Sequence, residues 1–155
     1  MHFNCIPTIV NLALRHIIDI YDQSCSADCR YIEDRDHLFV KCDFYGRIWS
    51  LVVSWLGFST APHKFLHDHL VQFGGLRGYS KNVRLSLNII SLYVVWTIWM
   101  KKNIRFFRHK EYHLLSLSEK VKLHSFWWLK LRLVTFKFHY LFWRINLISF
   151  LSVVN

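Results

Sequence analysis

Residues 25–42 read CSADCRYIEDRDHLFVKC and contain three of the four cysteines of the chain and one histidine. The side chains suited to binding a metal ion are Cys25, Cys29, His37 and Cys42. Three residues separate the first pair, four separate the second pair, and a loop of seven joins the pairs. Zinc takes thiolate or imidazole ligands at the corners of a tetrahedron, and ligands roughly two to four residues apart form a tight turn around it. The spacing predicts a zinc site with ligands in the order Cys-Cys-His-Cys, with chance spacing as the alternative.

Two other uses of clustered cysteines fit the sequence less well. A redox pair requires Cys-x-x-Cys beside a βαβ pattern, and the sequence has neither. A disulfide framework belongs to oxidising compartments, whereas the N-terminus, MHFNCIPTIV, lacks the basic start and uninterrupted apolar run of a signal peptide. We therefore expect a reducing compartment, either cytoplasm or nucleus, and we interpret Cys5 as a buried or idle thiol.

The segments on both sides of the Cys/His stretch have the apolar spacing of helices. Residues 8–21 place a set of apolar side chains on one helical face, and Thr8 is a suitable start. That set is Val10, Ala13, Leu14, Ile17, Ile18 and Tyr21. Apolar side chains within residues 44–56 also recur at helical spacing, and Gly57 follows where this helix should end.

The second half of the chain contains two more predicted helices. Residues 82–107 are the most apolar segment of the sequence. Ser116 and Glu119 form a capping-box pattern at the start of a helix that extends to about Thr135. Apolar and basic residues alternate within 129–140, so a strand is the alternative there.

The apolar run 85–100 could be a buried helix or a membrane anchor. A membrane span needs ~20 mostly apolar residues, and this run has only 16 residues with four polar side chains among them. A buried helix is therefore the prediction. The alternative is a small membrane-associated protein anchored by residues 85–100 and also by the apolar tail 145–154. Lys101, Lys102 and Arg105 support this alternative, because they would form the positively charged flank of a membrane span over residues 85–100.

Composition and breaker residues define the expected organisation. The 155 residues suffice for a substantial core, 53% are hydrophobic, and only 5 Gly and 2 Pro occur. We expect a mainly α-helical protein with a small N-terminal zinc-binding loop region, divided into residues 1–57, a connection over 58–80, and a basic, apolar helical region 81–155. The connection contains His63, His67 and His69 without a nearby Cys or Glu, which favours a solvated loop over a metal site.

Positive charge is concentrated in the second half of the chain. Residues 1–77 carry 7 Lys/Arg and 8 Asp/Glu, whereas residues 78–155 carry 13 Lys/Arg and two acidic residues. This asymmetry suggests a partner with phosphates, either RNA or DNA or an anionic membrane, and a lysine-rich solvated surface with no partner is an equal alternative. The candidate nucleic-acid contacts are Lys101, Lys102, Arg105, Arg108, Lys120, Lys122, Lys130 and Arg132. Phe126, Trp127 and Trp128 lie among them, and the two tryptophans are interpreted as core residues, with base stacking as the alternative.

The residues between and after the candidate ligands carry a family resemblance. Residues 33–49, EDRDHLFVKCDFYGRIW, resemble the zinc-binding domain downstream of the reverse transcriptase in plant non-LTR (LINE-type) retrotransposons. In that family a Cys pair precedes a Glu-containing loop, His-Leu-Phe, a further Cys and then Trp. The matching positions here are Cys25, Cys29, Glu33, His37, Leu38, Phe39, Cys42 and Trp49. Residues 6–16, IPTIVNLALRH, are similar to the family's preceding segment, although Ile9 and Val10 stand where the family has a basic residue.

The resemblance implies a non-catalytic, structural zinc module that assists nucleic-acid contacts or contacts with other domains of a retrotransposon polyprotein. The sequence lacks a Tyr-x-Asp-Asp-type polymerase motif and clustered carboxylates for two Mg²⁺ ions, so we expect no enzyme activity. All four zinc positions are filled by protein, which leaves none for a catalytic water. The alternatives are the membrane-associated protein described above and a retroelement relic without function.

Overall fold

The computed structural model describes residues 6–57, 59, 61, 63–75, 78–133 and 136–145. Its elements are α1 (Ile9–Leu14), the π-helix η2 (His37–Lys41), α2 (Arg47–Leu56), α3 (Leu66–Gly74), α4 (Lys81–Arg108), α5 (Leu114–Arg132) and α6 (Tyr140–Ile145). Within these residues there is no strand, only an isolated bridge between Ser24 and Ile32. The prediction of a mainly α-helical protein is confirmed. The predictions for Cys5 and for the tail 146–154 lie outside the described residues.

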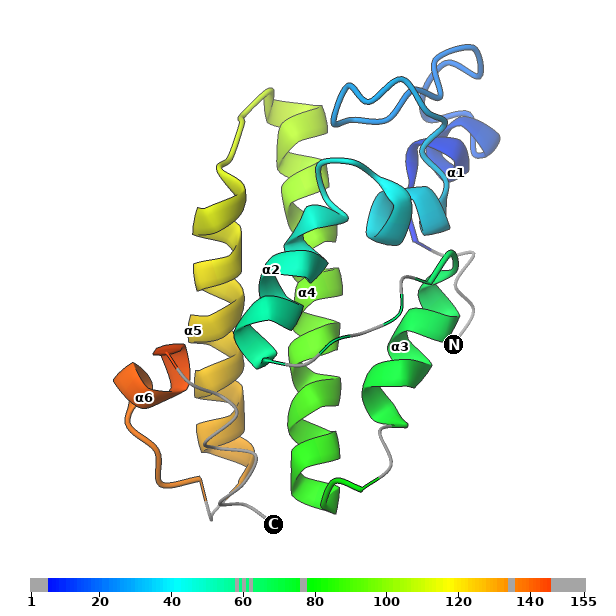
Figure 1. Cartoon of the computed structure of the whole chain (residues 1–155). Coiled ribbons are helices and arrows are strands. Elements are labelled where there is room, and N and C mark those ends of the chain that lie inside the picture. Colours follow the sequence, from blue (N-terminus) through cyan, green and yellow to red (C-terminus); the bar gives the residue numbers. More distant parts are fainter. Residues whose placement is uncertain are drawn as a thin grey trace.

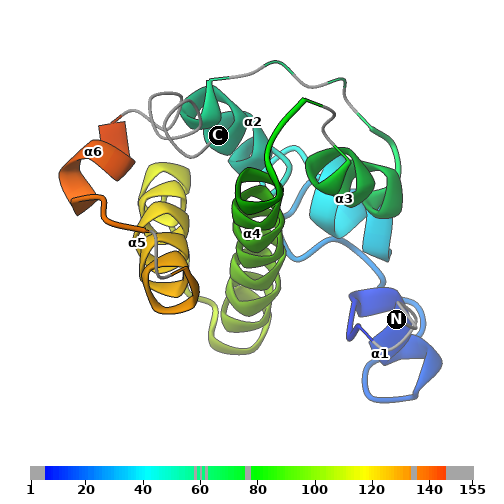
Figure 2. The same ribbon diagram turned by 90° about the horizontal axis from the view of Figure 1, so that it is seen from below.

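Helices α4 and α5 form an antiparallel pair that organises the fold (Figure 1). Helix α2 packs against α5 on one side of this pair, α3 lies beside α4, and α6 lies beside α5. The segment that contains α1 and the candidate metal ligands lies at the C-terminal end of α4 (Figure 1). Viewed along the pair, the side of α4 and α5 opposite α2 is not covered by another described helix (Figure 2).

One hydrophobic core joins the two halves of the chain. Its buried side chains come from α2, α3, α4 and α5, and they include Val52, Leu56, Phe73, Leu87, Ile90, Val94, Leu117 and Val121. Cys25 and Cys42 belong to the same buried cluster. The N-terminal and C-terminal regions therefore stabilise each other by burial of shared apolar surface.

The predicted helix over residues 82–107 is present as α4. The Ser80 hydroxyl accepts a hydrogen bond from the Val83 N–H (3.3 Å), and His109 ends the helix in the left-handed conformation at φ 51°. Val83, Leu87, Ile90, Val94 and Ile98 form its buried apolar face. Leu85, Leu92 and Trp96 lie on the opposite, exposed face. The run 85–100 is thus buried along one face only.

Helix α1 is shorter than predicted. The Thr8 cap is confirmed, because its side chain accepts a hydrogen bond from the Asn11 N–H (3.2 Å). The helix ends at Leu14, since His16 adopts φ 56°, a left-handed conformation that interrupts the helical backbone. Of the predicted apolar face, Ala13 is buried, whereas Leu14, Ile17 and Tyr21 are exposed, and the other buried residues of the helix are Ile9 and Leu12.

The connection over residues 58–80 contains a helix that the sequence did not indicate. Helix α3 buries Leu66, His69 and Phe73, so the prediction of a solvated loop is wrong for this part. Its C-terminal end approaches α4 closely, because a Cβ atom on Gly74 would lie 2.7 Å from Asn88 Oδ1. Gly74, which has no Cβ atom, therefore permits this close packing of α3 against α4.

The predicted start of α5 is also corrected. The helix begins at Leu114 after His113, and Ser116 and Glu119 do not form a capping box. Glu119 instead pairs with Lys122 (2.7 Å) and with Arg144 of α6 (2.6 Å). Residues 129–132 continue the helix, which rules out the alternative strand over this stretch.

Candidate metal centre

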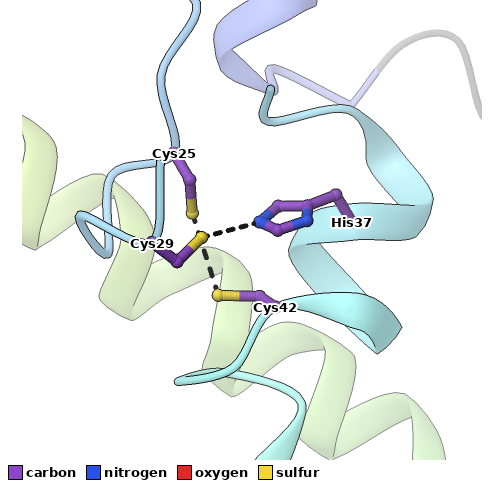
Figure 3. Close-up of side chains that lie close together, drawn as sticks. All are labelled: Cys25, Cys29, His37 and Cys42. Carbon is purple, nitrogen blue, oxygen red and sulfur yellow. Dashed lines mark hydrogen bonds between the residues drawn. The ribbon is translucent and has the colours of Figure 1, made fainter. Parts of the chain in front are cut away.

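The four predicted metal ligands converge on one point (Figure 3). One ligand atom from each of Cys25, Cys29, His37 and Cys42 lies within 4.8 Å of the other three. The two sulfur atoms of Cys25 and Cys42 are 3.8 Å apart, and Cys29 Sγ is 3.1 Å from His37 Nε2. Zn–S bonds of about 2.3 Å place two sulfur ligands of a tetrahedron about 3.8 Å apart. The Cys25–Cys42 distance matches this value, and the expected convergence of the four side chains is confirmed, because they lie close enough to one another to bind a metal ion.

A tight turn brings the first two ligands together. The Cys25 N–H donates to the Tyr31 carbonyl (2.8 Å), which closes the loop that contains Cys29. Asp28 and Arg30, on either side of Cys29, adopt left-handed φ values of 59° and 64°. Aspartate tolerates this region better than most residues, and the reversal turns the Cys29 sulfur back toward Cys25.

The second pair of ligands flanks the single turn of π-helix. The Cys42 N–H donates to the His37 carbonyl (2.7 Å), an i→i+5 hydrogen bond that aligns residues five apart on one side of the turn. The Asp34 carboxylate accepts a hydrogen bond from the His37 N–H (2.6 Å) and fixes the start of this turn. After it, Gly46 is required by space, because a Cβ atom there would lie 2.5 Å from the Val40 carbonyl oxygen.

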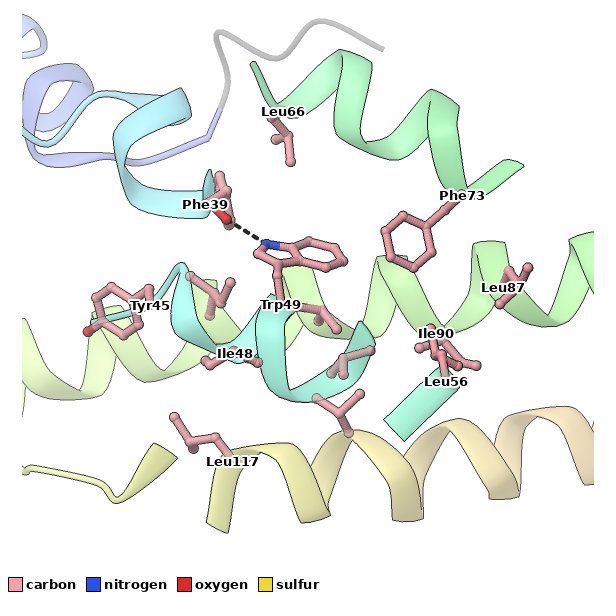
Figure 4. Close-up of a cluster of buried hydrophobic side chains, with 14 of the residues drawn as sticks. Phe39, Tyr45, Ile48, Trp49, Leu56, Leu66, Phe73, Leu87, Ile90 and Leu117 are labelled. Atoms are coloured by element: carbon pink, nitrogen blue, oxygen red, sulfur yellow. Dashed lines mark hydrogen bonds between the residues drawn. The ribbon is translucent and has the colours of Figure 1, made fainter. Parts of the chain in front are cut away.

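The apolar residues of this motif anchor the site to the core (Figure 4). Leu38 and Phe39 are buried within η2. The Trp49 indole N–H of α2 donates to the Phe39 carbonyl (2.6 Å), so α2 and η2 are held together by a buried hydrogen bond. The ligands His37 and Cys42 are therefore positioned by packing as well as by chain connectivity.

The environment of the two buried sulfur atoms favours a thiolate at Cys42 and a protonated thiol at Cys25. Cys25 and Cys42 are buried, and the Ala27 N–H lies 3.4 Å from Cys25 Sγ. The hydrogen bond from Cys25, aided by backbone N–H groups of Tyr45 and Phe44, lowers the pKa of Cys42 to about 6. The same contact with Cys42, together with burial, raises the pKa of Cys25. Metal binding requires deprotonated sulfur, so a site that already stabilises one thiolate suits a divalent cation.

Three sulfur atoms and one imidazole form a donor set that suits zinc. Thiolate and imidazole are preferred by zinc, whereas magnesium and calcium prefer oxygen ligands. Three thiolates around Zn²⁺ leave a net charge of −1, so this centre would not attract phosphate by itself. A metal ion bound by these four side chains would tie the loop after α1 to the π-helix.

Glu33 is a buried, multiply bonded residue beside the candidate site that spacing arguments did not assign. Its side chain is fully buried and accepts hydrogen bonds from the Ile9 N–H (3.2 Å), the Ser26 N–H (2.9 Å) and the Ser26 hydroxyl (2.7 Å). It also forms an ion pair with Lys102 Nζ (3.4 Å), whose exposure is likewise 0%. Glu33 thus connects α1, the residue after Cys25 and helix α4. The only sequence signal for it was its place in the family motif.

Two of the predicted nucleic-acid contacts are buried, which corrects the prediction for them. Lys102 pairs with Glu33 and donates to the Pro7 carbonyl (2.8 Å). Burial lowers the pKa of Lys102, although Glu33 opposes this effect. Lys101 is 5% exposed, with its ammonium 3.8 Å from the centre of the Tyr112 ring. Neither side chain can reach a phosphate without leaving the core.

Two further candidates are already paired with carboxylates. Arg105 contacts Asp28 (2.9 Å) and Glu111 (3.6 Å), and Lys122 contacts Glu119. The remaining candidates, Arg108, Lys120, Lys130 and Arg132, are exposed. The expected cationic surface is therefore reduced to about half of the predicted residues.

Comparison of the chain with known protein families, with curated protein sequences and with solved structures finds no match.

Proposed function

We propose that this protein is a non-catalytic zinc-binding module of the type that lies downstream of the reverse transcriptase in plant non-LTR retrotransposons. The observation that carries the proposal is the convergence of Cys25, Cys29, His37 and Cys42 within 4.8 Å. The other motif residues support it by their positions. Glu33 binds the Cys25 turn through Ser26, and Trp49 binds the π-helix through the Phe39 carbonyl.

In this function zinc is structural. The centre fixes the loop after α1 against the C-terminal end of α4, where Glu33 and Lys102 form a second link. A rigid N-terminal region would present the surface of the α4–α5 pair, or of adjoining polyprotein domains, in a defined orientation. No step of catalysis is assigned to these residues.

The exposed end of α5 is the surface best suited to nucleic acid. Trp127 and Trp128 are 51% and 47% exposed, so their interpretation as core residues is wrong, while Phe126 is buried. The Lys130 ammonium lies 5.3 Å from the Trp127 ring centre and the Arg132 guanidinium 5.6 Å from that of Trp128. Cations beside exposed aromatic faces favour binding of phosphates together with stacking of unpaired bases.

We expect single-stranded RNA or DNA to bind this surface with little sequence preference. The logarithm of the affinity should fall with the logarithm of salt concentration at a slope near −0.7 for each phosphate contacted on single strands. Lys130→Glu with Arg132→Glu should flatten this slope by roughly one to two units. Fluorescence anisotropy with a labelled oligonucleotide over a series of salt concentrations measures the slope.

The matched control is Arg47→Glu with Lys64→Glu, which changes net charge equally at exposed positions outside α5. The control should lower affinity slightly through net charge and leave the slope within experimental error of the original protein. Equal slopes for the original protein and the α5 variant, or absence of binding at low salt, would contradict the proposed surface.

Membrane association is a second candidate function because of one observation on α4. This 28-residue helix is long and apolar enough to cross a membrane. Less than half of its most apolar stretch of 18 residues, 44%, is buried within the protein. However, its buried face contains Lys102 and three hydroxyl side chains, and Lys102, Ser86 and Ser91 have partners within the fold or in the helix itself.

We expect alkaline carbonate to release the protein from membranes of expressing cells. Insertion of α4 would separate Lys102 from Glu33 and place an ammonium in hydrocarbon, at a cost of roughly 3 kcal/mol or more. The measurement is the distribution of the protein between pellet and supernatant, with an integral membrane protein as a control for retention. Retention in the pellet would support the membrane-associated alternative.

A further inference from the structure

The side of α4 and α5 that lies opposite α2 carries exposed apolar side chains. In α4, Leu85, Leu92 and Trp96 recur at helical spacing and are 42%, 56% and 50% exposed. In α5, Trp127 and Leu131 lie four residues apart and are also exposed. No other described helix covers this side of the pair (Figure 2). We call these five side chains the α4–α5 face.

A contact between the two helices shows that both rows of the α4–α5 face lie on the same side. The Tyr93 ring stacks on the His124 ring, with centroids 5.2 Å apart and an angle of 14° between the planes. Trp96 follows Tyr93 by three residues, and Trp127 follows His124 by three. Because residues three apart share a side of a helix, the two tryptophans belong to one continuous surface. Contiguous exposed apolar surface of this kind marks an interaction site.

The charge around the α4–α5 face has one sign. All exposed charged side chains of the two helices are cationic, namely Lys81, Arg84, Arg108, Lys120, Lys130 and Arg132. The single acidic residue of the two helices, Glu119, is already paired with Lys122 and Arg144. Lys120 lies seven residues before Trp127 and therefore on the same side of α5. The occupant of this face has to combine an apolar surface with negative charge.

Three occupants meet this requirement to different degrees. A second copy of the chain would bring like charges together across the interface, which disfavours association. A nucleic-acid strand offers phosphates but no apolar chains for Leu85, Leu92 and Leu131. An anionic lipid surface offers both, and Trp and Tyr rings are enriched at the level of lipid headgroups. It also accepts a broad pair of helices without a groove of matching shape.

We therefore propose that the α4–α5 face binds the surface of an anionic membrane peripherally, with both helices lying along the surface. Unlike insertion of α4, this mode leaves Ile90 and Val94 in the core and Lys102 paired with Glu33. Exposed leucine and tryptophan side chains would enter the boundary between headgroups and acyl chains, about 5–10 Å deep for interfacial helices. Lys120 would reach the headgroup phosphates.

The test uses the full-length, zinc-loaded protein and vesicles of phosphatidylcholine, with or without an equal part of phosphatidylglycerol. Cosedimentation should show binding to the anionic vesicles that is about tenfold or more tighter than to phosphatidylcholine alone. Leu92→Gln with Trp96→Gln should weaken binding to the anionic vesicles about tenfold or more, because less apolar surface leaves water. Lys120→Glu should reduce the difference between the two kinds of vesicle.

The matched control is Phe65→Gln with Val71→Gln. It changes two exposed apolar side chains in and next to α3, which lies on the same side of the pair as α2 (Figure 2). This control should bind the anionic vesicles like the original protein. Both double variants should keep the helical circular dichroism and the zinc content of the original protein, which separates loss of the face from loss of the fold.

The remaining outcomes overturn the inference. Absence of binding to anionic vesicles does so, as does equal binding by the original protein and the Leu92→Gln, Trp96→Gln variant. Retention of vesicle-bound protein after alkaline carbonate would assign α4 to a membrane span. A dimer that this variant dissociates would assign the face to a second copy, and vesicle binding that appears only after deletion of residues 146–155 would assign it to the tail.

The inference does not depend on the zinc module or on nucleic-acid binding. Trp127 belongs to both proposed surfaces, so the variants above leave it unchanged. The salt dependence of oligonucleotide binding is measured without lipid, and the vesicle assay is measured without nucleic acid. Either proposal can therefore fail alone.

Discussion

Replacement of Cys42 by serine is expected to abolish stoichiometric zinc binding. The original protein should contain one zinc ion, because the four ligand atoms lie within 4.8 Å of one another and Cys42 is buried among them. Structural zinc binds comparable peptide sites with about 10–16 kcal/mol at neutral pH. Serine offers a hydroxyl in place of a thiolate, so most of this affinity should be lost. Metal analysis of the purified protein and competition with a chromophoric chelator measure the effect.

Cys5→Ser is the matched control, since it removes the one cysteine outside the 25–42 stretch. This variant should keep one zinc ion and the original affinity. Substitution by Co²⁺ gives an independent readout, because thiolate-to-cobalt charge-transfer bands appear only when sulfur is bound. A protein without zinc, or a Cys42→Ser variant that binds it as tightly as the original, would show that the cluster is not a metal site.

Removal of zinc should unfold the N-terminal loops locally. The α4–α5 pair buries Leu87, Val94 and Val121 in a core shared with α2 and α3, so most of the helical signal in circular dichroism should remain after chelation. Hydrogen exchange should accelerate in residues 24–42, whose turns depend on the metal. Complete and simultaneous loss of the helical signal would show that the metal instead controls folding of the whole protein.

Replacement of Glu33 by glutamine is expected to lower the free energy of unfolding of the zinc-loaded protein by roughly 3–5 kcal/mol. The carboxylate and Lys102 form a completely buried ion pair, and loss of one partner leaves the other charge uncompensated. The glutamine amide would also turn a donor toward the N–H group of Ile9 or Ser26, which now donate to Glu33. Urea denaturation at saturating zinc measures the loss.

A double-mutant cycle separates the ion pair from the other contacts of Glu33. Lys102→Met in the Glu33→Gln background should restore part of the lost stability, because methionine removes the unpaired buried charge and keeps an apolar stem. Glu119→Gln is the surface control. Its partners Lys122 and Arg144 lie in α5 and α6, and Glu119 is itself partly exposed, so we expect a change of about 1 kcal/mol or less. Equal losses for Glu33→Gln and Glu119→Gln would contradict a special role for the buried pair.

The sequence by itself determined the features that depend on neighbours along the chain. The ligands lie close in sequence and are joined by short turns, so their spacing was sufficient to predict the cluster. The end of α2 at Gly57 and the Thr8 cap were predicted for the same reason, since φ 74° at the glycine and the Thr8 hydrogen bond are local. Helix α4 followed from its long apolar run.

Only the tertiary structure decided which side chains are buried. Lys101 and Lys102 follow Ile98 by three and four residues, and therefore share the buried face of α4, but periodicity cannot show that Glu33 lies opposite Lys102. The buried face of α3 was missed because it depends on the packing of Phe73 and His69 beside Trp49, which is distant in sequence. Burial depends on residues distant in sequence, and for that reason the sequence alone indicated the candidate metal ligands but not the ion pair or the burial of His69.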